Sequence, residues 1–352
     1  MKKSRLEPDP DADALLTLKF PNLQQVRPVK EQDVLENVKA EPTPWEIFEG
    51  IEEEEEEEKE EAKGENPTDI DEVVSLQPYD ENGNPNEIEF GVSTKQLYMA
   101  SPVFDRMLKG NFQESKPDDE GLLEIRAQDW NARALLILLD IIHGHHRQVP
   151  RELDLDTVAH IALLVDYYDC LEIVEVFLDH WLVGIPQWWL YEWPMFSDYL
   201  ARPFGEDEVL MLFIAWVFRR QKAFKNLTDC AIKTTSNPPE TPLPIPSQVL
   251  VEIDQQRTDI LDELFSQLYN LQEDILVRRY GCTLDCSKRL LGHLMMQMWH
   301  NGLPMSKPEY PFEGFRVSSV VNAIHTIKSS ISGSGKHSLD TWLSLKNLCI
   351  KP

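Results

Sequence analysis

The fold of this chain is constrained most by residues 97–115, whose sequence is LYMASPVFDRMLKGNFQES. Ser101 is a favourable N-cap and Pro102 suits the first helical position, so the pair marks the start of a new helix. One face of that helix carries apolar side chains: Val103, Met107 and Leu108. Gly110 ends the helix and a loop with an aromatic residue, Phe112, follows. The segment predicts a bent pair of short helices and contains no nucleophile–base pair.

The charge of the chain limits its partners. The 352 residues suggest about two domains and carry a net charge of −27. Residues 1–70 hold 21 acidic and 9 basic residues, and the remainder is also acidic. Such a surface repels phosphate backbones, and no basic stripe offsets it. We therefore expect no nucleic-acid partner.

Targeting signals and cysteines bear on the compartment. The first residues, MKKSRLEPDP, lack an apolar run, which argues against a secretory signal. The longest apolar stretch, 209–218, has about half the length needed to span a bilayer, so we expect no membrane partner. Five cysteines are few and odd in number, as in proteins of a reducing compartment. We expect an intracellular protein, in the cytoplasm or the nucleus.

Residues 1–68 are expected to be a disordered acidic arm. They are rich in proline and glutamate, with a run of glutamates at 52–58. Like charges at this spacing oppose helix formation, and little apolar surface is available to offset the ordering entropy. The arm either binds a basic partner or keeps the protein soluble, and we favour the second role.

Residues 69–183 are expected to form an α+β domain. Three segments read as short strands: 73–76, 88–92 and 122–127. Asp129 and Asp156 are candidate N-caps of the helices that follow, and His143-Gly144 is expected to end the first of them. Three strands followed by a helical cluster predict a mixed domain.

Residues 184–352 are expected to be helical, with a proline-rich loop at 237–246. A long helix from Ser247 to about residue 278 carries an apolar stripe with steps of three and four residues: Leu261, Leu264, Leu268, Leu271 and Ile275. The stripe is either an intramolecular packing face or the seam of a self-associating coiled coil. It is short for a coiled coil, so we favour the packing face.

The order of these elements resembles a family of known domains. The strands around the Ser101-Pro102 bend are arranged as in BTB/POZ domains, and residues 138–144 and 165–170 are similar to fungal members of that family. Segments near 282–292 and 308–314 resemble the helical C-terminal extension that some of those proteins carry. The resemblance implies a BTB/POZ-like three-stranded sheet capped by helices, followed by a helical region. It implies a protein-interaction module, an adaptor or scaffold, with no catalysis and no cofactor.

The resemblance also suggests partners. BTB domains of ubiquitin-ligase adaptors contact the cullin scaffold through a hydrophobic-x-Glu step after the second signature helix, which Phe112-Gln113-Glu114 matches. Met107 and Lys109, just before this step, complete the candidate protein-binding residues. The alternative is that Phe112 folds back onto its own domain. A homodimer is also an alternative, although the acidic arm occupies the position of the strand and helix that dimeric animal BTB domains exchange.

One group of residues could bind a metal. Cys282, Cys286 and His293 have a tolerable spacing for zinc, which would make this a zinc-dependent protein. However, His293 and His300 lie two turns apart on one expected helix, about 10 Å, which is too far for a shared ion. The histidines of 143–146 lie where a helix ends, and there they suit the negative end of its dipole. The sequence predicts no metal and no catalytic residue.

Overall fold

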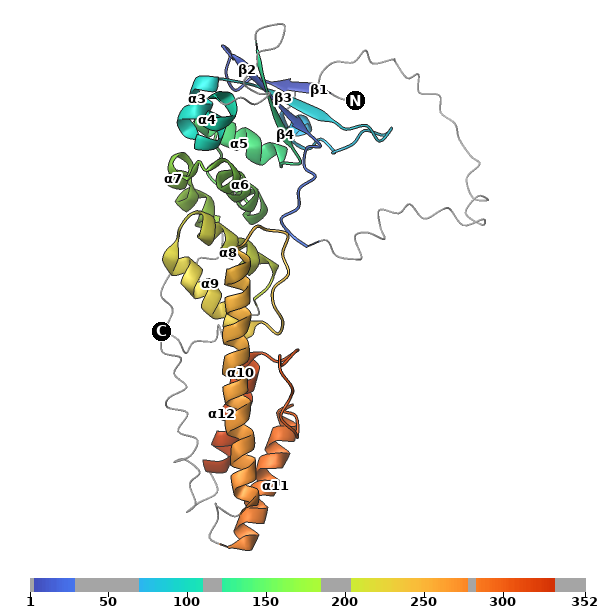
Figure 1. Cartoon of the computed structure of the whole chain (residues 1–352), viewed down its shortest axis with the longest axis vertical. Helices are drawn as coiled ribbons and strands as arrows, with labels where there is room; N and C mark the ends of the chain where they lie inside the picture. Colours follow the sequence, from blue (N-terminus) through green and yellow to red (C-terminus); the bar gives the residue numbers. More distant parts are fainter. Residues whose placement is uncertain (1–2, 29–69, 110–121, 185–203, 278–282, 333–352) are drawn as a thin grey trace, which may run out of the picture. The chain divides into compact units, whose positions relative to one another are not determined.

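The computed structural model describes residues 3–28, 70–109, 122–184, 204–277 and 283–332 (Figure 1). The chain divides into two compact units. The first comprises residues 1–187, 213–219 and 241–244, and the second comprises 188–212, 220–240 and 245–352. The first unit contains a sheet and helices, and the second contains helices. This confirms the α+β class that the sequence predicts.

A four-stranded sheet lies in the first unit. Its strands are β1 (Lys3–Leu6), β2 (Ala14–Lys19), β3 (Glu87–Val92) and β4 (Leu123–Gln128). They are arranged in the order β1-β3-β2-β4 (Figure 1). Strand β2 runs antiparallel to β3 and parallel to β4, and β1 runs parallel to β3. The two central strands are therefore β3 and β2.

Two expectations about this sheet are wrong. Strands β1 and β2 come from the segment that was expected to be disordered, and residues 73–74, the start of the first expected strand, belong instead to helix α2 (Ile70–Val74). Leu16 and Leu18 are fully buried, so β2 contributes to the core. Its partners β3 and β4 lie far along the chain, which hides the pairing from local patterns. The glutamate run, in residues 29–69, lies outside the described residues, between β2 and β3 in the sequence.

Strand β3 is covered on both faces. Ile88, Phe90 and Val92 are completely buried on one face. On the other, a Cβ atom at Gly91 would lie 3.2 Å from the Cβ of Ala12, and the Asp9 amide donates a hydrogen bond of 3.1 Å to the Gly91 carbonyl. The segment between β1 and β2 thus crosses β3 closely, and a side chain at position 91 would require Ala12 to shift by a few tenths of an ångström.

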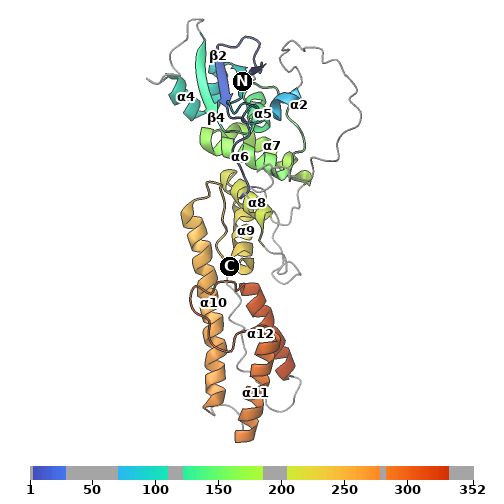
Figure 2. The same ribbon diagram turned by 90° about the vertical axis from the view of Figure 1, so that its right-hand side faces the viewer.

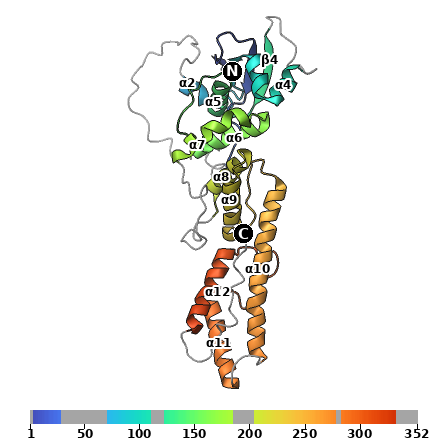
Figure 3. The ribbon, with the colours of Figure 1, turned by 90° about the vertical axis from the view of Figure 1, so that its left-hand side faces the viewer.

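Seven helical segments accompany the sheet in the described part of this unit, not counting α8. They are α2, α3 (Thr94–Ala100), α4 (Pro102–Lys109), α5 (Ala132–Ile142), α6 (Leu155–Tyr168), α7 (Leu171–Trp181) and the 3₁₀ turn η3 (Leu182–Gly184). Helix α5 is apolar on nearly every side because it packs against α2, α3, α6 and α7 (Figure 3). It is the central helix of the unit.

The N-caps of α5 and α6 differ from the expected residues. Asn131 accepts a hydrogen bond of 2.9 Å from the Ala134 amide, and Asp154 accepts one of 2.8 Å from the Thr157 amide. Asp129 instead adopts a positive φ of 70° in the loop before α5. Asp156 binds Arg27 through two hydrogen bonds of 2.8 and 2.5 Å. Each predicted cap was two residues from the true cap, within the same acidic or polar cluster.

The second unit is helical. It contains α9 (Gln221–Thr234), α10 (Ser247–Leu276), α11 (Leu284–His300) and α12 (Val317–Ser332), and α8 (Glu206–Val217) spans its boundary. The proline-rich residues 237–246 form neither helix nor strand. Helix α10 contacts α9, α11 and α12, and these last two lie beside it (Figure 2).

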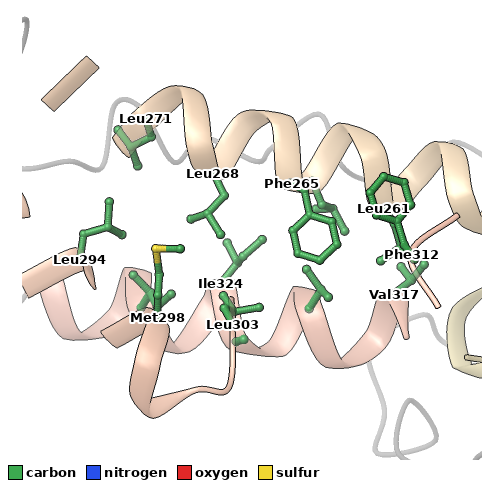
Figure 4. Packing of buried hydrophobic residues seen from close by; sticks show 14 of the residues in the cluster. Leu261, Phe265, Leu268, Leu271, Leu294, Met298, Leu303, Phe312, Val317 and Ile324 are labelled. Carbon is green, nitrogen blue, oxygen red and sulfur yellow. The ribbon is translucent and has the colours of Figure 1, made fainter. Parts of the chain in front are cut away.

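The apolar stripe of α10 forms the core of this unit. Leu261, Leu268 and Ile275 are at most 5% exposed and belong to one cluster with residues of α11 and α12. Figure 4 shows Leu294 and Met298 of α11 among the side chains that face them. The stripe is therefore an intramolecular packing face. The coiled-coil alternative is wrong for these residues, because their side chains are already buried within their own unit.

A buried arginine fixes the loop before α12. Arg257 of α10 is 1% exposed and forms an ion pair of 2.8 Å with Asp254. Its remaining guanidinium donors bind the carbonyl oxygens of Pro311, Phe312 and Phe315, at 3.2, 3.4 and 3.3 Å. The planar guanidinium group thus ties three backbone acceptors to the long helix and also binds Asp254, four acceptors in all, which is one more than the three donors of a lysine could bind.

Candidate protein-interaction site

The bend between α3 and α4 is formed by Ser101, as the sequence predicts. Its hydroxyl oxygen accepts hydrogen bonds of 3.1 Å from the amides of Val103 and Phe104, and the same hydroxyl donates to the carbonyl of Tyr168 at 2.5 Å. Pro102 occupies the first position of α4, where no amide donor is needed. A single side chain therefore caps α4 and attaches the bend to the end of α6.

Helices α3 and α4 form a helical hairpin, called the hairpin below. Its inner side is packed against the domain. Leu97, Phe104 and Leu108 are buried. The ring of Phe104 stacks on that of Tyr168, with centroids 4.3 Å apart and an interplanar angle of 14°. Burial raises the pKa of Tyr168, so this ring stays neutral and serves as packing surface. The hairpin is thus held by apolar contact as well as by the Ser101 hydroxyl.

The start of α3 is held by two residues from distant parts of the chain. Asp13, just before β2, accepts hydrogen bonds of 2.7 Å from both the amide and the hydroxyl of Thr94. His143, at the end of α5, accepts a hydrogen bond of 2.9 Å from the Ser93 amide through Nε2. Sequence analysis missed both roles, because neither residue lies near α3 in the sequence and no local spacing connects them.

His143 is neutral in this arrangement. Its Nδ1 donates to the Leu139 carbonyl at 2.8 Å, so Nε2 carries no proton and can accept from Ser93. Burial lowers the pKa of His143, which is consistent with this neutral form. The helix does end at this residue, as predicted. Its imidazole, however, acts as a hydrogen-bond acceptor between two helices rather than as a cation at the helix dipole.

The outer side of the hairpin faces solvent. Met99 is 74% exposed, Met107 is half-buried and Lys109 is exposed. Lys109 forms an ion pair with Asp105, and its ammonium group lies 4.2 Å from the centre of the Tyr98 ring. Methionine side chains adapt to different partner shapes. The contact between the Lys109 ammonium group and the Tyr98 ring fixes the position of both side chains beside the methionines. This outer surface, Tyr98, Met99, Met107 and Lys109, is called the hairpin surface below.

Three of the predicted protein-binding residues, Phe112, Gln113 and Glu114, lie outside the described residues. The other two, Met107 and Lys109, lie in the last turn of α4, where Met107 is half-buried and Lys109 is exposed. The residue that the sequence analysis missed is Met99, at the end of α3. Met99 and Met107 lie in different helices on either side of the bend at Ser101, so helical periodicity could not assign them to one surface.

The predicted zinc ligands are only partly described. Cys286 and His293 lie on α11, seven residues apart, and therefore about 10 Å apart along the helix. Cys282 lies outside the described residues. Among the described residues, no group of three or more His, Cys, Asp or Glu side chains could hold a metal ion. The pair on α11 does not by itself form a binding site.

The described residues include three free cysteines. Burial raises the pKa of the Cys170 thiol to about 12, which leaves it protonated and unreactive at neutral pH. Cys230 and Cys286 are also free thiols. None of the described helices is both long and apolar enough to cross a lipid bilayer.

Comparison with known proteins identifies the domain that contains the hairpin. The family model of the BTB/POZ domain matches residues 85–181, from just before β3 to the end of α7. No curated protein and no solved structure matches the chain. Strands β1 and β2 complete the same sheet although they precede the matched region. Residues 85–181 are therefore a BTB/POZ domain, a module through which proteins bind other proteins.

Proposed function

We propose that this protein is a non-catalytic adaptor that binds a partner protein through the hairpin surface of its BTB/POZ domain. The observation that supports this most is the contrast between the two sides of α3 and α4. The inner side is buried and attached by Ser101, while the outer side presents Met99 and Lys109 to solvent. A rigid element with an adaptable exposed face suits protein recognition.

A cullin scaffold is one partner that the sequence suggests, which would make the protein a substrate adaptor of a cullin-RING ubiquitin ligase. Phe112-Gln113-Glu114 follows α4 and matches the hydrophobic-x-Glu step of such adaptors. In this proposal Phe112 fills an apolar pocket of the cullin and Glu114 fixes the register. Met107 and Lys109, at the end of α4, extend the same contact. We place this function inside the cell, in the cytoplasm or the nucleus.

Affinity purification of the full-length chain from cells, with mass spectrometry, tests this proposal. We expect a cullin to co-purify with the unmutated protein. Phe112→Ala and Met99→Glu should each reduce that recovery at least about tenfold, because hot-spot side chains contribute about 2 kcal/mol or more. The control is Val176→Glu, which places the same charge on an exposed apolar position of α7 and should leave recovery unchanged.

Melting temperatures of the same variants separate binding from folding. All three should melt within about 2 °C of the unmutated protein if the substituted side chains serve recognition. A large loss of stability in Phe112→Ala would show that this side chain closes the loop on its own domain. If no cullin co-purifies but another protein does, and Met99→Glu loses that protein, the ligase role would be contradicted and the adaptor role would stand. Equal recovery of every partner in all variants would contradict the hairpin surface.

A further inference from the structure

Helix α11 of the second unit is apolar on two different sides. One side faces the core, where Leu294 and Met298 are buried against α10 and α12. The other side carries Trp299, which is 72% exposed, Met296, which is 61% exposed, and the exposed side chains of Leu284 and Met295. A large aromatic, a leucine and two methionines in solvent on one helix form more than the scattered apolar exposure of ordinary surfaces.

These exposed residues form one face. Gly292, Met295 and Trp299 are separated by three and four residues, so they follow one another along the same side of the helix. A Cβ atom at Gly292 would have no neighbour within 4 Å, so the middle of this face is flat and open. We call the exposed side of α11 the outer face, defined by Leu284, Gly292, Met295, Met296 and Trp299. Helices α10 and α12 pack on α11 but leave this face uncovered.

The chain continues from a helix that contacts α11. Helix α12, which contacts α11, ends at Ser332. The next six residues, GSGKHS at 333–338, have the composition of a linker and can span about 20 Å. Helix α11 is about 25 Å long, so most of its length lies within reach of the residues that follow.

The sequence after this linker has the composition of a docking segment. Residues 339–350 have the sequence LDTWLSLKNLCI. Trp342 and Leu343 follow Leu339 by three and four residues, and Ile350 follows Leu343 by seven. This spacing would bring them to one side if the segment became helical on contact. An amphipathic segment with aromatic and leucine anchors is the kind of ligand that a methionine-rich helix face accommodates.

We propose that residues 339–350 bind the outer face of α11 within the same chain. The short linker favours this occupant over a second copy or another protein, because it holds the segment at an effective concentration on the order of millimolar. Trp299 and Met296 would then be covered by Trp342 and Leu343. The C-terminal segment would act as a built-in ligand that a competing protein must displace to reach α11.

Hydrogen exchange of the full-length protein, followed by mass spectrometry, tests this proposal. We expect the amides of 339–350 to exchange at least about tenfold more slowly than those of a free peptide of the same sequence. Trp299→Glu should return them to the peptide rate. Trp342→Glu should do the same without any change to α11, which keeps the test valid if the first variant disturbs the helix. The slow exchange should not depend on protein concentration.

The control is His293→Glu, which adds the same charge to an exposed position of α11 about a third of a turn from Trp299. Residues 339–350 should stay protected in this variant. Three results would overturn the proposal. They are exchange at the peptide rate in the unmutated protein, protection that survives Trp299→Glu and Trp342→Glu, and protection that disappears on dilution together with a dimer seen by sedimentation.

Discussion

The two units of this protein each have an apolar core, and the BTB/POZ unit also carries polar contacts that join segments far apart in the sequence. In the BTB/POZ unit, single polar side chains connect segments that are far apart in the sequence, as Asp13 does with Thr94 and His143 with Ser93. In the second unit, three helices share one apolar cluster, and each buried residue contributes a part of it (Figure 4). Stability in both units therefore depends on the volume and shape of an apolar core, and in the BTB/POZ unit it depends in addition on a few specific hydrogen bonds.

The largest effect is expected in the apolar cluster. Phe265 of α10 is completely buried, and its ring lies 5.6 Å from that of Phe312 and 5.2 Å from that of Phe315. Phe265→Ala should lower the stability of the second unit by about 3–5 kcal/mol, because it removes a large apolar group and leaves a cavity. Hydrogen exchange of the slowest amides in α10 and α12 measures this loss.

A matched substitution on the same helix sharpens the comparison. Val251 of α10 is exposed, so Val251→Ala should change the stability of the unit by less than about 0.5 kcal/mol. The amides of the BTB/POZ sheet should keep their exchange rates in both variants. Equal losses in the two α10 variants would show that the cluster does not hold the unit together.

The next largest effect is expected at a polar residue of the BTB/POZ unit. Asn22, after β2, donates two hydrogen bonds to the carbonyls of Val74 and Leu76, at 2.9 and 3.0 Å, and accepts one of 2.8 Å from the Ala132 amide. Asn22→Ala leaves all three groups without their partner and should cost about 2–3 kcal/mol. The residue also has a φ of 62°, which asparagine tolerates better than alanine.

The role of Asn22 can be divided between its two ends. Asn22→Asp keeps the oxygen that accepts from Ala132 but places a second oxygen against the carbonyls of Val74 and Leu76. We expect it to destabilise the unit at least as much as Asn22→Ala at neutral pH. Denaturant unfolding followed by circular dichroism measures both variants. A loss below about 0.5 kcal/mol in each would show that these segments are held by other contacts.

This difference between the units also explains what the sequence could predict. The stripe from Leu261 to Ile275 and the Ser101 cap are local patterns, so their helices were predicted correctly. Strand β2 was missed because its partners follow a long, highly charged segment, and charge dominated the interpretation of residues 1–68. Asp13 and His143 were also missed as residues that hold the hairpin, because both bind residues far from them in the sequence. Their partners are set by tertiary structure, which no spacing rule encodes.

A smaller effect is expected at the bend itself. Ser101→Ala removes the cap of α4 and the donor to the Tyr168 carbonyl, and should cost about 1–2 kcal/mol. Ser101→Thr keeps the hydroxyl group and should recover most of this loss. Thermal melting of the three proteins measures the difference. If alanine and threonine were equally destabilising, steric fit rather than the hydroxyl would hold the bend.

The smallest effect is expected from the pH dependence of the hairpin anchor. Burial lowers the pKa of His143 in the folded state, whereas the unfolded chain should titrate near about 6.5. The contribution of neutral His143 to the free energy of unfolding is complete above the pKa of the unfolded chain. It decreases as the pH falls, because the unfolded state then binds a proton that the folded state excludes, and it levels off below the folded pKa.

His143→Gln isolates this contribution, since glutamine can still accept from the Ser93 amide but does not titrate. The stability of the unmutated protein relative to this variant should decrease as the pH is lowered from about 7.5 to 5, measured by denaturant unfolding. His160, whose pKa burial also lowers, and Asp140 and Asp166, whose pKa values burial raises, are present in both proteins and cancel in the difference. Parallel stability curves would show that His143 binds its proton equally well in the folded and the unfolded protein, and so is not held by its bond to Ser93. Of the two residues that hold the start of α3, only Asp13 would then contribute to its stability.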